Sequence, residues 1–397
     1  MPHANRRPRP GLASALVLAL GLASILPLSA QTPPPAKVPA QGAAAAQTPA
    51  RATIRHATGF TVAYREGYKL VSVSKPWPGA TERFEYVLYP RGKPRPAYAG
   101  KAVFMETPLR RVVSYSSTYL PQILAAGGLE SLVGLDNAAY VSSPEVRARV
   151  ASGKAVETSR NFAPNVELLI SLAPDAIFTY GVGNEWDSHP KLAEAGLPVV
   201  LDGEWNESDP LARAEWMKFI ALFYDAEAAA EARFAAVERD YLRLKALAAG
   251  GSGARPKVLV NAPFQGLWTV AGGKSYQARF IADSGGDYLW AEDGRTGGIP
   301  LSVEAAYARG LSAELWLNPG AADSLAALAA SDARIADLPV LKKGAVYSPT
   351  LRVNEAGAND YYESGVMRPD LVLADLVRIL RPELKLGGEL HYYKRLR

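Results

Sequence analysis

Aromatic, hydroxyl and cationic side chains that follow short apolar segments are the residues of this sequence best suited to bind a ligand. Each stands near the carboxyl end of a predicted strand, which is where open α/β sheets bind ligands. Aromatic faces suit a large planar or catecholate-type chelate, and an arginine suits anionic charge. The alternative for each aromatic is ordinary packing in the core. The ligand-binding candidates are Tyr115, Ser116, Tyr180 with Gly181 and Gly183, Phe264, Trp268, and Arg352.

Two glutamates occupy corresponding places in a repeated pattern. Residues 164–177 and 301–315 each read as a capped helix start, one helix, a break and an apolar strand, with Glu167 and Glu304 in the first helical turn. This repeated pattern predicts two lobes of similar construction. The alternative is that each acid only satisfies free N–H groups and the dipole at a helix N-terminus.

Three possible metal ligands alternate in Glu185-Trp-Asp187-Ser-His189. Sites for free zinc or manganese need several His and acidic side chains that converge. This segment is flanked by Gly and Pro, which predicts a solvated loop. A binding protein for a free metal ion therefore stays open as an alternative, without a predicted metal site.

The common catalytic motifs are not found in this sequence. It has no G-x-S-x-G, P-loop or H-E-x-x-H motif. With no cysteine and four histidines, acid–base chemistry would fall to carboxylates, and no carboxylate pair stands out. We expect no enzyme and no cofactor. An exported α/β hydrolase-type enzyme remains the alternative from another class, with no residues to name for it.

The first thirty residues have the pattern of a secretory signal peptide. A basic start with Arg6, Arg7 and Arg9 precedes an apolar stretch over 12–28 and a small-residue cleavage site at 28–30. Removing it lowers the basic residues from 44 to 41 against 39 acidic ones, a net charge of about +2. This near balance argues against a nucleic-acid partner. Without a lipidatable cysteine, we expect a free periplasmic monomer.

The composition, with 48% apolar and 21% charged residues, is that of a globular protein. Residues 31–52 are rich in Pro, Ala and Gln and predict a linker. Alternating or β-branched runs with Pro/Gly punctuation predict a β meander over 53–105. From 106 to 209 short strands alternate with helices, which predicts an α/β lobe with a mostly parallel sheet.

A long segment without interior Gly or Pro then interrupts the alternation. Residues 210–249 are dense in Ala, Leu, Glu and Arg and predict one connecting helix, roughly 50 Å long at 1.5 Å per residue. The α/β pattern resumes over 254–397. The predicted fold is α/β, with two Rossmann-like lobes joined by a single long helix and preceded by the meander. The segment 359–370 is polar and aromatic, and predicts either a cleft rim or a cap for the last helix.

Several motifs together resemble the iron-siderophore and vitamin B12 class of periplasmic binding proteins of ABC importers. The segment 110–135 resembles that family's opening strand, helix and strand, and 165–177 its helix followed by P-D-x-I. The segment 271–288, with its two double glycines, resembles the helix of the C-terminal lobe. The resemblance covers residues 106–381.

This resemblance implies a function and partners. It implies a cleft between the lobes that binds an iron-siderophore or a cobalamin-like metal chelate, and an ABC permease at the inner membrane as the protein partner. It further implies one acidic residue per lobe that docks onto permease arginines. Glu167 matches the N-terminal element. Glu304 is assigned by internal symmetry only, because Lys274 stands where some relatives carry an acid.

Overall fold

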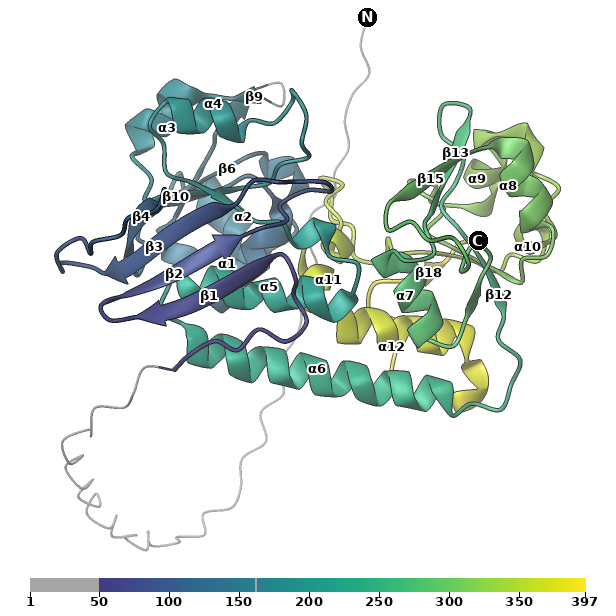
Figure 1. The fold of residues 1–397 in the computed structure, drawn as a ribbon. Coiled ribbons are helices and arrows are strands. Elements are labelled where there is room, and N and C mark those ends of the chain that lie inside the picture. The colour runs from purple at the N-terminus through teal and green to yellow at the C-terminus, as the bar shows by residue number, and fades with distance from the viewer. Residues whose placement is uncertain (1–49, 161–162) are drawn as a thin grey trace, which may run out of the picture. The chain divides into compact units, whose positions relative to one another are not determined.

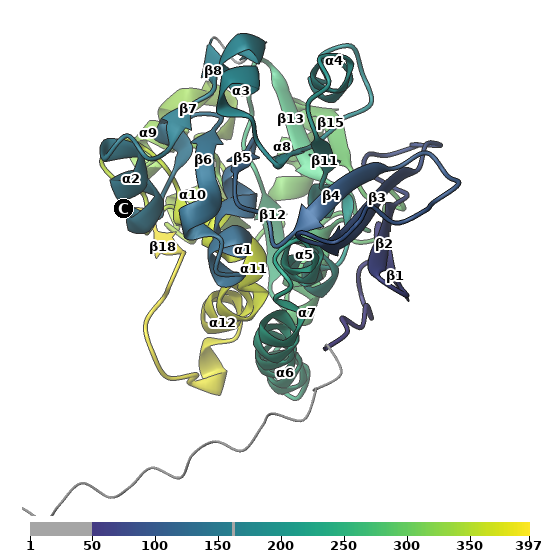
Figure 2. The ribbon, with the colours of Figure 1, turned by 90° about the vertical axis from the view of Figure 1, so that its left-hand side faces the viewer.

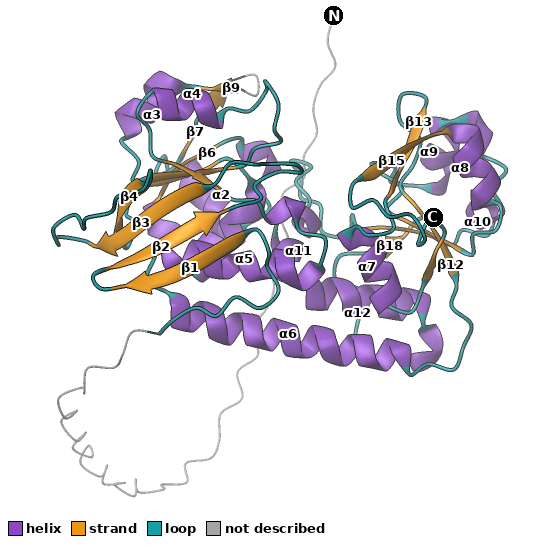
Figure 3. Ribbon diagram, in the orientation of Figure 1, coloured by secondary structure: helices purple, strands orange, loops and turns teal. Residues whose placement is uncertain are grey.

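The computed structural model describes residues 50–160 and 163–397, so the predicted signal peptide and most of the predicted linker lie outside the described residues. Ala50–Arg397 form one compact unit. It contains two five-stranded α/β sheets and a further four-stranded β-sheet (Figures 1 and 3). Within the described ranges, none of the helices combines the length and apolar character needed to cross a membrane.

The N-terminal sheet has four strands in the order β1-β2-β3-β4. Its first two pairings are antiparallel, whereas β4 pairs parallel to β3, so the last strand departs from the predicted meander. Phe60 and Tyr86 pack on Phe219 of helix α5, which lies beside this sheet (Figure 2). The elements are β1 (Phe60–Arg65), β2 (Tyr68–Val73), β3 (Phe84–Pro90), β4 (Val103–Thr107) and α5 (Pro210–Leu222).

The N-terminal lobe has a fully parallel sheet in the order β11-β10-β5-β6-β7. Its central strands are short apolar runs and are almost completely buried, as expected of a parallel sheet with both faces covered. Its elements are β5 (Val112–Ser114), α1 (Leu120–Ala125), β6 (Leu132–Leu135), α2 (Pro144–Ala151), β7 (Val156–Glu157), β8 (Ser159–Arg160), β9 (Ala163–Pro164), α3 (Val166–Leu172), β10 (Ala176–Thr179), α4 (His189–Glu194) and β11 (Val199–Leu201).

The C-terminal lobe has the sheet order β14-β12-β16-β17-β18, parallel except for the last pair, and a separate hairpin of β13 and β15. Its elements are β12 (Lys257–Val260), β13 (Leu267–Ala271), α7 (Tyr276–Asp283), β14 (Asp287–Tyr288), β15 (Gly298–Ser302), α8 (Val303–Gly310), β16 (Leu315–Leu317), α9 (Leu325–Ser331), α10 (Pro339–Lys342), β17 (Val346–Ser348), α11 (Ser364–Met367), α12 (Pro369–Leu380) and β18 (Lys394–Arg395). The predicted α/β class is therefore correct.

The single helix predicted over 210–249 is wrong, because the structure has two helices, α5 and α6 (Glu227–Ala249). Between them Asp225 has a positive φ of 52°, a conformation that Asp tolerates better than most residues. The Lys69 ammonium holds the break by donating to the Leu222 carbonyl at 2.5 Å and to the Asp225 and Glu227 carboxylates. The two helices also meet different surroundings: α5 is buried on nearly all sides and α6 along one stripe.

The buried stripe of α6 explains how one helix serves both lobes. The stripe recurs at alternating intervals of four and three residues, the spacing of one helical face. It packs on α5 and on α12, and Figure 1 shows α6 passing beneath both lobes. The stripe consists of Ala230, Phe234, Val237, Tyr241, Leu244 and Ala248.

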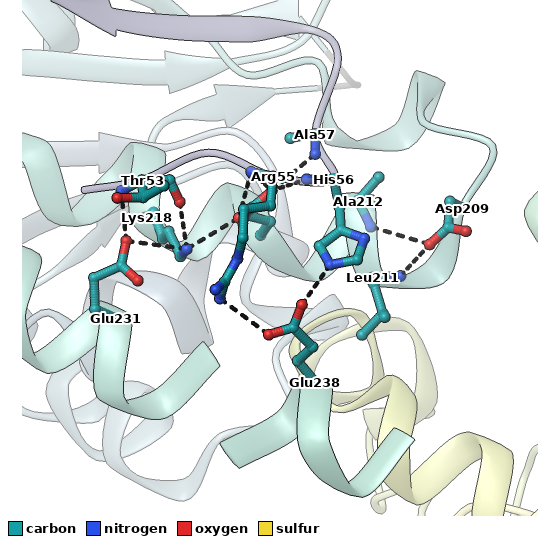
Figure 4. A network of polar contacts seen from close by, with 11 residues as sticks. Thr53, Arg55, His56, Ala57, Asp209, Leu211, Ala212, Lys218, Glu231 and Glu238 are labelled. Atoms are coloured by element: carbon teal, nitrogen blue, oxygen red, sulfur yellow. Dashed lines mark hydrogen bonds and ion pairs between the residues drawn. The ribbon is translucent and has the colours of Figure 1, made fainter. Parts of the chain in front are cut away.

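A buried ion pair on α5 fixes the segment that precedes β1 (Figure 4). The Glu215 carboxylate, with no exposed side-chain surface, accepts backbone N–H bonds from Arg55, His56 and Ala57 at 2.6–3.0 Å and lies 3.0 Å from Lys218 Nζ. Burial opposes ionisation of this carboxyl, but these bonds outweigh it and lower its pKa. Lys218 also donates to the Thr53 carbonyl. The N-terminal sheet is thereby tied to α5 by charge as well as by packing.

Candidate functional site

A pocket of about 600 Å³ lies between the two lobes. The N-terminal lobe contributes Ser117 and Tyr140, which follow β5 and β6 at the carboxyl edge of its sheet. The C-terminal lobe contributes residues that follow β16 and β17, the segment before α11, and the first residue of β18. These are Asn318, Gly320, Ala321, Ala322, Asp323, Pro349, Thr350, Val353, Gly357, Ala358, Asn359, Tyr362 and Lys394.

Two further pockets extend the same boundary. One of about 100 Å³ reaches α5 and is lined by Thr118, Arg213, Tyr276 and Tyr362 among others. The other, of about 360 Å³, lies between the Trp205–Ser208 segment and the start of α7, and Tyr276 lines it too. Tyr362 lines the first two of these pockets and Tyr276 the last two, so the three pockets adjoin one another, and together they are called the cleft. The cleft runs between the carboxyl edge of the N-terminal sheet and the C-terminal lobe.

A charged group lies at the α5 side of this cleft. Arg213 Nε and Nη2 donate to one Glu204 oxygen at 2.8 and 2.6 Å, and its guanidinium stands over the Tyr276 ring at 4.4 Å. Burial alone would lower the arginine pKa, but Glu204 outweighs it and raises that pKa. Neighbouring Asp202 is fully buried, and burial together with Glu204 raises its pKa well above the usual range. The cleft is therefore bordered by an arginine whose orientation is fixed and whose charge is already paired with Glu204.

The predicted cleft residues of the N-terminal lobe lie at one edge of its sheet but differ in exposure. Tyr115 is buried, and its hydroxyl receives a hydrogen bond from Thr158 Oγ1 at 3.2 Å. Ser116 caps the turn that begins α1 by accepting from Thr118 N–H. Tyr180, directly after β10, is 46% exposed. Tyr180 is thus open to solvent, whereas Tyr115 is packed in the lobe, and neither Tyr115, Ser116 nor Tyr180 lines one of the three pockets.

The predicted residues of the C-terminal lobe are not brought together. Phe264 is 74% exposed beside the turn that leads into β13. Trp268 cannot contact a ligand in this arrangement, because it is fully buried, stacks on Trp316 at 5.4 Å and donates to the Val260 carbonyl. Its assignment to the cleft was wrong. Arg352 is half-exposed, and its Nε donates to Asp360 at 2.6 Å beside the 600 Å³ pocket.

Both predicted docking glutamates are exposed in the first turns of their helices. Glu167 lies in α3 and has no hydrogen-bond or ion-pair partner among the described side chains. Glu304 lies in α8, 2.6 Å from Arg334 Nη1, and this arginine lowers the Glu304 pKa. Figure 1 shows α3 and α8 on the side of their lobes remote from α6.

Asp187 and His189, which were considered as ligands for a free metal ion, contact other residues of the chain. Asp187 accepts N–H bonds from Val182 and Gly183, and His189 is buried beside Trp77. Over residues 50–160 and 163–397, no three His, Cys, Asp or Glu side chains are grouped to hold a metal ion.

Sequence reasoning missed several residues of the cleft. Arg213 and Tyr276 lie in α5 and α7, so no strand end marks them, and Tyr140 is the last residue of a short 3-10 turn that follows β6. The polar aromatic segment 359–370 did carry a signal, since Asn359 and Tyr362 line the 600 Å³ pocket.

Comparison with curated proteins finds distant relatives of similar length. An uncharacterised lipoprotein of Methanocaldococcus jannaschii is 26% identical over 324 residues, which covers 78% of this chain and 75% of the relative. A second uncharacterised lipoprotein of that organism is 25% identical over 311 residues, covering 74% of this chain and 75% of the relative. Because both are called lipoproteins, they give no support to the expectation of a protein without a lipid anchor.

Solved structures share the fold. A periplasmic heme-binding protein from Pseudomonas aeruginosa has a TM-score of 0.53 at 20% identity, covering 70% of this chain and 95% of that one. An ABC transporter substrate-binding protein from Listeria monocytogenes has a TM-score of 0.51 at 14% identity, covering 69% and 99%. A possible iron-binding, periplasmic solute-binding protein from Staphylococcus epidermidis has a TM-score of 0.54 at 15% identity, covering 69% and 100%.

The family model described as periplasmic binding protein matches residues 112–349, well over half of the chain. The match begins at β5 and ends just after β17, so it takes in the sheet of the N-terminal lobe and every strand of the C-terminal sheet except β18. The chain belongs to the periplasmic binding protein family.

Proposed function

We propose that this protein is the ligand-capture subunit of an ABC importer, which binds an iron-siderophore or cobalamin-like metal chelate between its lobes and delivers it to the permease. The observation that carries the proposal is the set of adjoining pockets between the lobes, one of which has a volume of about 600 Å³. This volume is within the range of small-molecule sites.

The chemistry of the cleft supports a chelate with an aromatic or planar periphery. Tyr140 and Tyr362, on opposite sides of the 600 Å³ pocket, are 54% and 56% exposed. Exposed phenol rings offer flat apolar faces with a polar edge. Arg213 and Lys394 supply positive charge for carboxylate or phenolate groups of such a ligand. The heme and iron named for two proteins of the same fold fit this class of ligand.

Tryptophan fluorescence of the purified protein, titrated with ferric siderophores, haem and cobalamin, tests the proposal. We expect saturable quenching at micromolar concentration or below for one class. Tyr362→Ala should weaken binding about tenfold, the effect of losing roughly 1.4 kcal/mol. The control is Leu242→Ala, which removes an exposed apolar side chain from α6. No binding by the folded protein, or equal affinities in all three proteins, would contradict the proposed site.

A further inference from the structure

The N-terminal sheet lies outside the residues matched by the family model, yet one of its loops reaches the cleft. Residues 75–78 lie in the loop between β2 and β3. Pro78 lines the 360 Å³ pocket together with Trp205 of the N-terminal lobe and Tyr276 of the C-terminal lobe. This loop is thus a third wall of the cleft, built from a part of the chain that precedes both lobes.

The indole of Trp77 is fitted closely against the loop that follows β10, residues 180–187. A Cβ added to Gly181 or to Gly183 would come within 2.6 Å of the indole, so both positions must be glycine for the loop to lie this close. The indole also packs on the His189 ring, with the ring centroids 5.3 Å apart and an interplanar angle of 33°. Trp77 therefore contacts the 180–187 loop and the start of α4 at once.

The loop itself has a defined conformation. Asp187 accepts hydrogen bonds from Val182 N–H at 2.7 Å and Gly183 N–H at 2.8 Å, which closes the loop on itself. Asn184 accepts one from Trp186 N–H at 3.0 Å. The loop begins with Tyr180, the exposed tyrosine at the carboxyl edge of the sheet.

The same segment also contacts the loop that follows β11. A Cβ on Gly203 would lie 3.0 Å from the Pro76 Cα, and Asn206 Nδ2 donates to the Lys75 carbonyl at 3.2 Å. Residues 75–78 thus contact both loops that leave the carboxyl ends of β10 and β11. Loops in this position carry ligand contacts in α/β sheets, and a rigid support limits the entropy they lose on binding.

We propose that residues 75–78 are a positioning element of the ligand cleft, in which Trp77 holds the 180–187 loop, and with it Tyr180, in the conformation that receives the ligand. The ligand in this proposal is the one that the proposed function assigns to the protein, whereas the first test needs no ligand. Trp77 acts through the loop and is a positioning residue.

Amide hydrogen exchange on the ligand-free full chain gives that test. Trp77→Ala should speed exchange of Val182 and Gly183 N–H at least about tenfold, a loss of roughly 1.4 kcal/mol of local protection. Exchange in β5 and β10 should stay unchanged, and Trp77→Phe should restore most of the protection. The control is Tyr98→Ala, an aromatic of the same N-terminal region whose hydroxyl donates to Glu85. Unchanged exchange at Val182 and Gly183 in Trp77→Ala would overturn the proposal.

A second variant covers the possibility that Trp77→Ala fails to fold. Gly181→Ala places a methyl group against the indole and should loosen the same loop. Unchanged exchange of Val182 and Gly183 N–H in Gly181→Ala would overturn the contact.

The role of residues 75–78 in ligand binding is tested separately, by titration with a ligand that the wild-type protein binds. Trp77→Ala should weaken its affinity about tenfold and Tyr98→Ala should leave it unchanged. Faster loop exchange with unaltered affinity would overturn the positioning role. If wild-type protein binds none of the chelates, the proposed function fails, whereas the exchange data still decide whether Trp77 holds the loop.

Discussion

Glu363 of the C-terminal lobe caps the start of helix α2 in the other lobe: its Oε1 accepts from Ser143 N–H at 2.9 Å and its Oε2 from Ser142 N–H at 2.6 Å. Ser143 is itself the N-cap of α2. Nearby, Asn354 Nδ2 donates to the Val141 carbonyl at 3.0 Å. The segment that borders the cleft in one lobe is therefore bonded to the other lobe through a nearly fully buried carboxyl group.

Burial raises the Glu363 pKa from 4.5 to about 7, with smaller contributions from Asp360 and Glu145, although the two N–H bonds act against it. A raised folded-state pKa means that the folded protein binds the proton more tightly than the unfolded chain. This contribution to stability is full below pH 4.5 and is lost as the pH rises to about 7. Glu363→Gln has no carboxyl group to titrate, so it should abolish this fall in the free energy of unfolding between pH 4.5 and about 7. Urea titrations at several pH values measure that free energy for both proteins.

The matched control for this pH series is Glu355→Gln, an exposed glutamate of the same segment. Its unfolding free energy should follow the wild-type pH dependence. If Glu363→Gln also kept the wild-type slope between pH 4.5 and about 7, the buried carboxyl would not be the group that titrates there.

Glu215→Ala should destabilise the protein by about 3–5 kcal/mol, because it removes one of the two carboxylates that lie 3.0 Å from the buried Lys218 and frees three backbone N–H groups of the segment before β1. Glu238→Ala removes a more exposed carboxylate that contacts Arg55 and His56, and should cost about 1 kcal/mol or less. Equilibrium urea unfolding compares the two. Similar losses would mean that burial does not distinguish the two carboxylates.

Local pattern predicted most of the strands and helices because each is defined by a short stretch of sequence. The strands β6, β10, β12 and β16 fall within the two stretches predicted as α/β lobes, 106–209 and 254–397, since each is a short and mostly buried apolar run. The break between α5 and α6 could not be predicted this way. It contains no Gly or Pro, and it is held by Lys69, which lies more than 150 residues away in the sequence.

The site was less predictable because exposure depends on how distant segments pack. Trp268 and Leu267 are neighbours in one alternating strand, yet Trp268 is fully buried and Leu267 is 52% exposed. The alternation is visible in the sequence, but which face is buried depends on Trp316 of another strand. Likewise, Arg213 and Tyr276 border the cleft only because α5 and α7 come together there.

Trp268 and Phe264 should therefore respond to substitution in opposite ways. Trp268→Ala removes a buried ring that stacks on Trp316 and should cost about 3–5 kcal/mol of unfolding free energy. Phe264→Ala, at a 74% exposed position, should change that free energy by less than about 0.5 kcal/mol. Urea unfolding of both variants measures this contrast. A near-neutral Trp268→Ala would refute the packing described for the core of the C-terminal lobe.

Glu167→Arg should abolish ligand uptake by cells while leaving the affinity of the purified protein for its ligand unchanged, if the exposed α3 start meets permease arginines. Reversing an interfacial charge replaces attraction by repulsion and costs about 2 kcal/mol or more, roughly thirtyfold in complex affinity. Glu66→Arg, at an exposed turn of the N-terminal sheet, is the control and should transport normally.

Glu304 differs from Glu167 because Arg334 already pairs with it. Docking through Glu304 would require a permease arginine to displace Arg334 or to share the carboxylate. Arg334→Ala should then strengthen the complex with the permease, whereas Glu304→Arg should weaken it as Glu167→Arg does. Pull-down of the permease with each variant measures the complexes. If Glu304→Arg transports and binds normally while Glu167→Arg does not, the docking contact of the C-terminal lobe lies elsewhere, and the internal symmetry does not extend to this function.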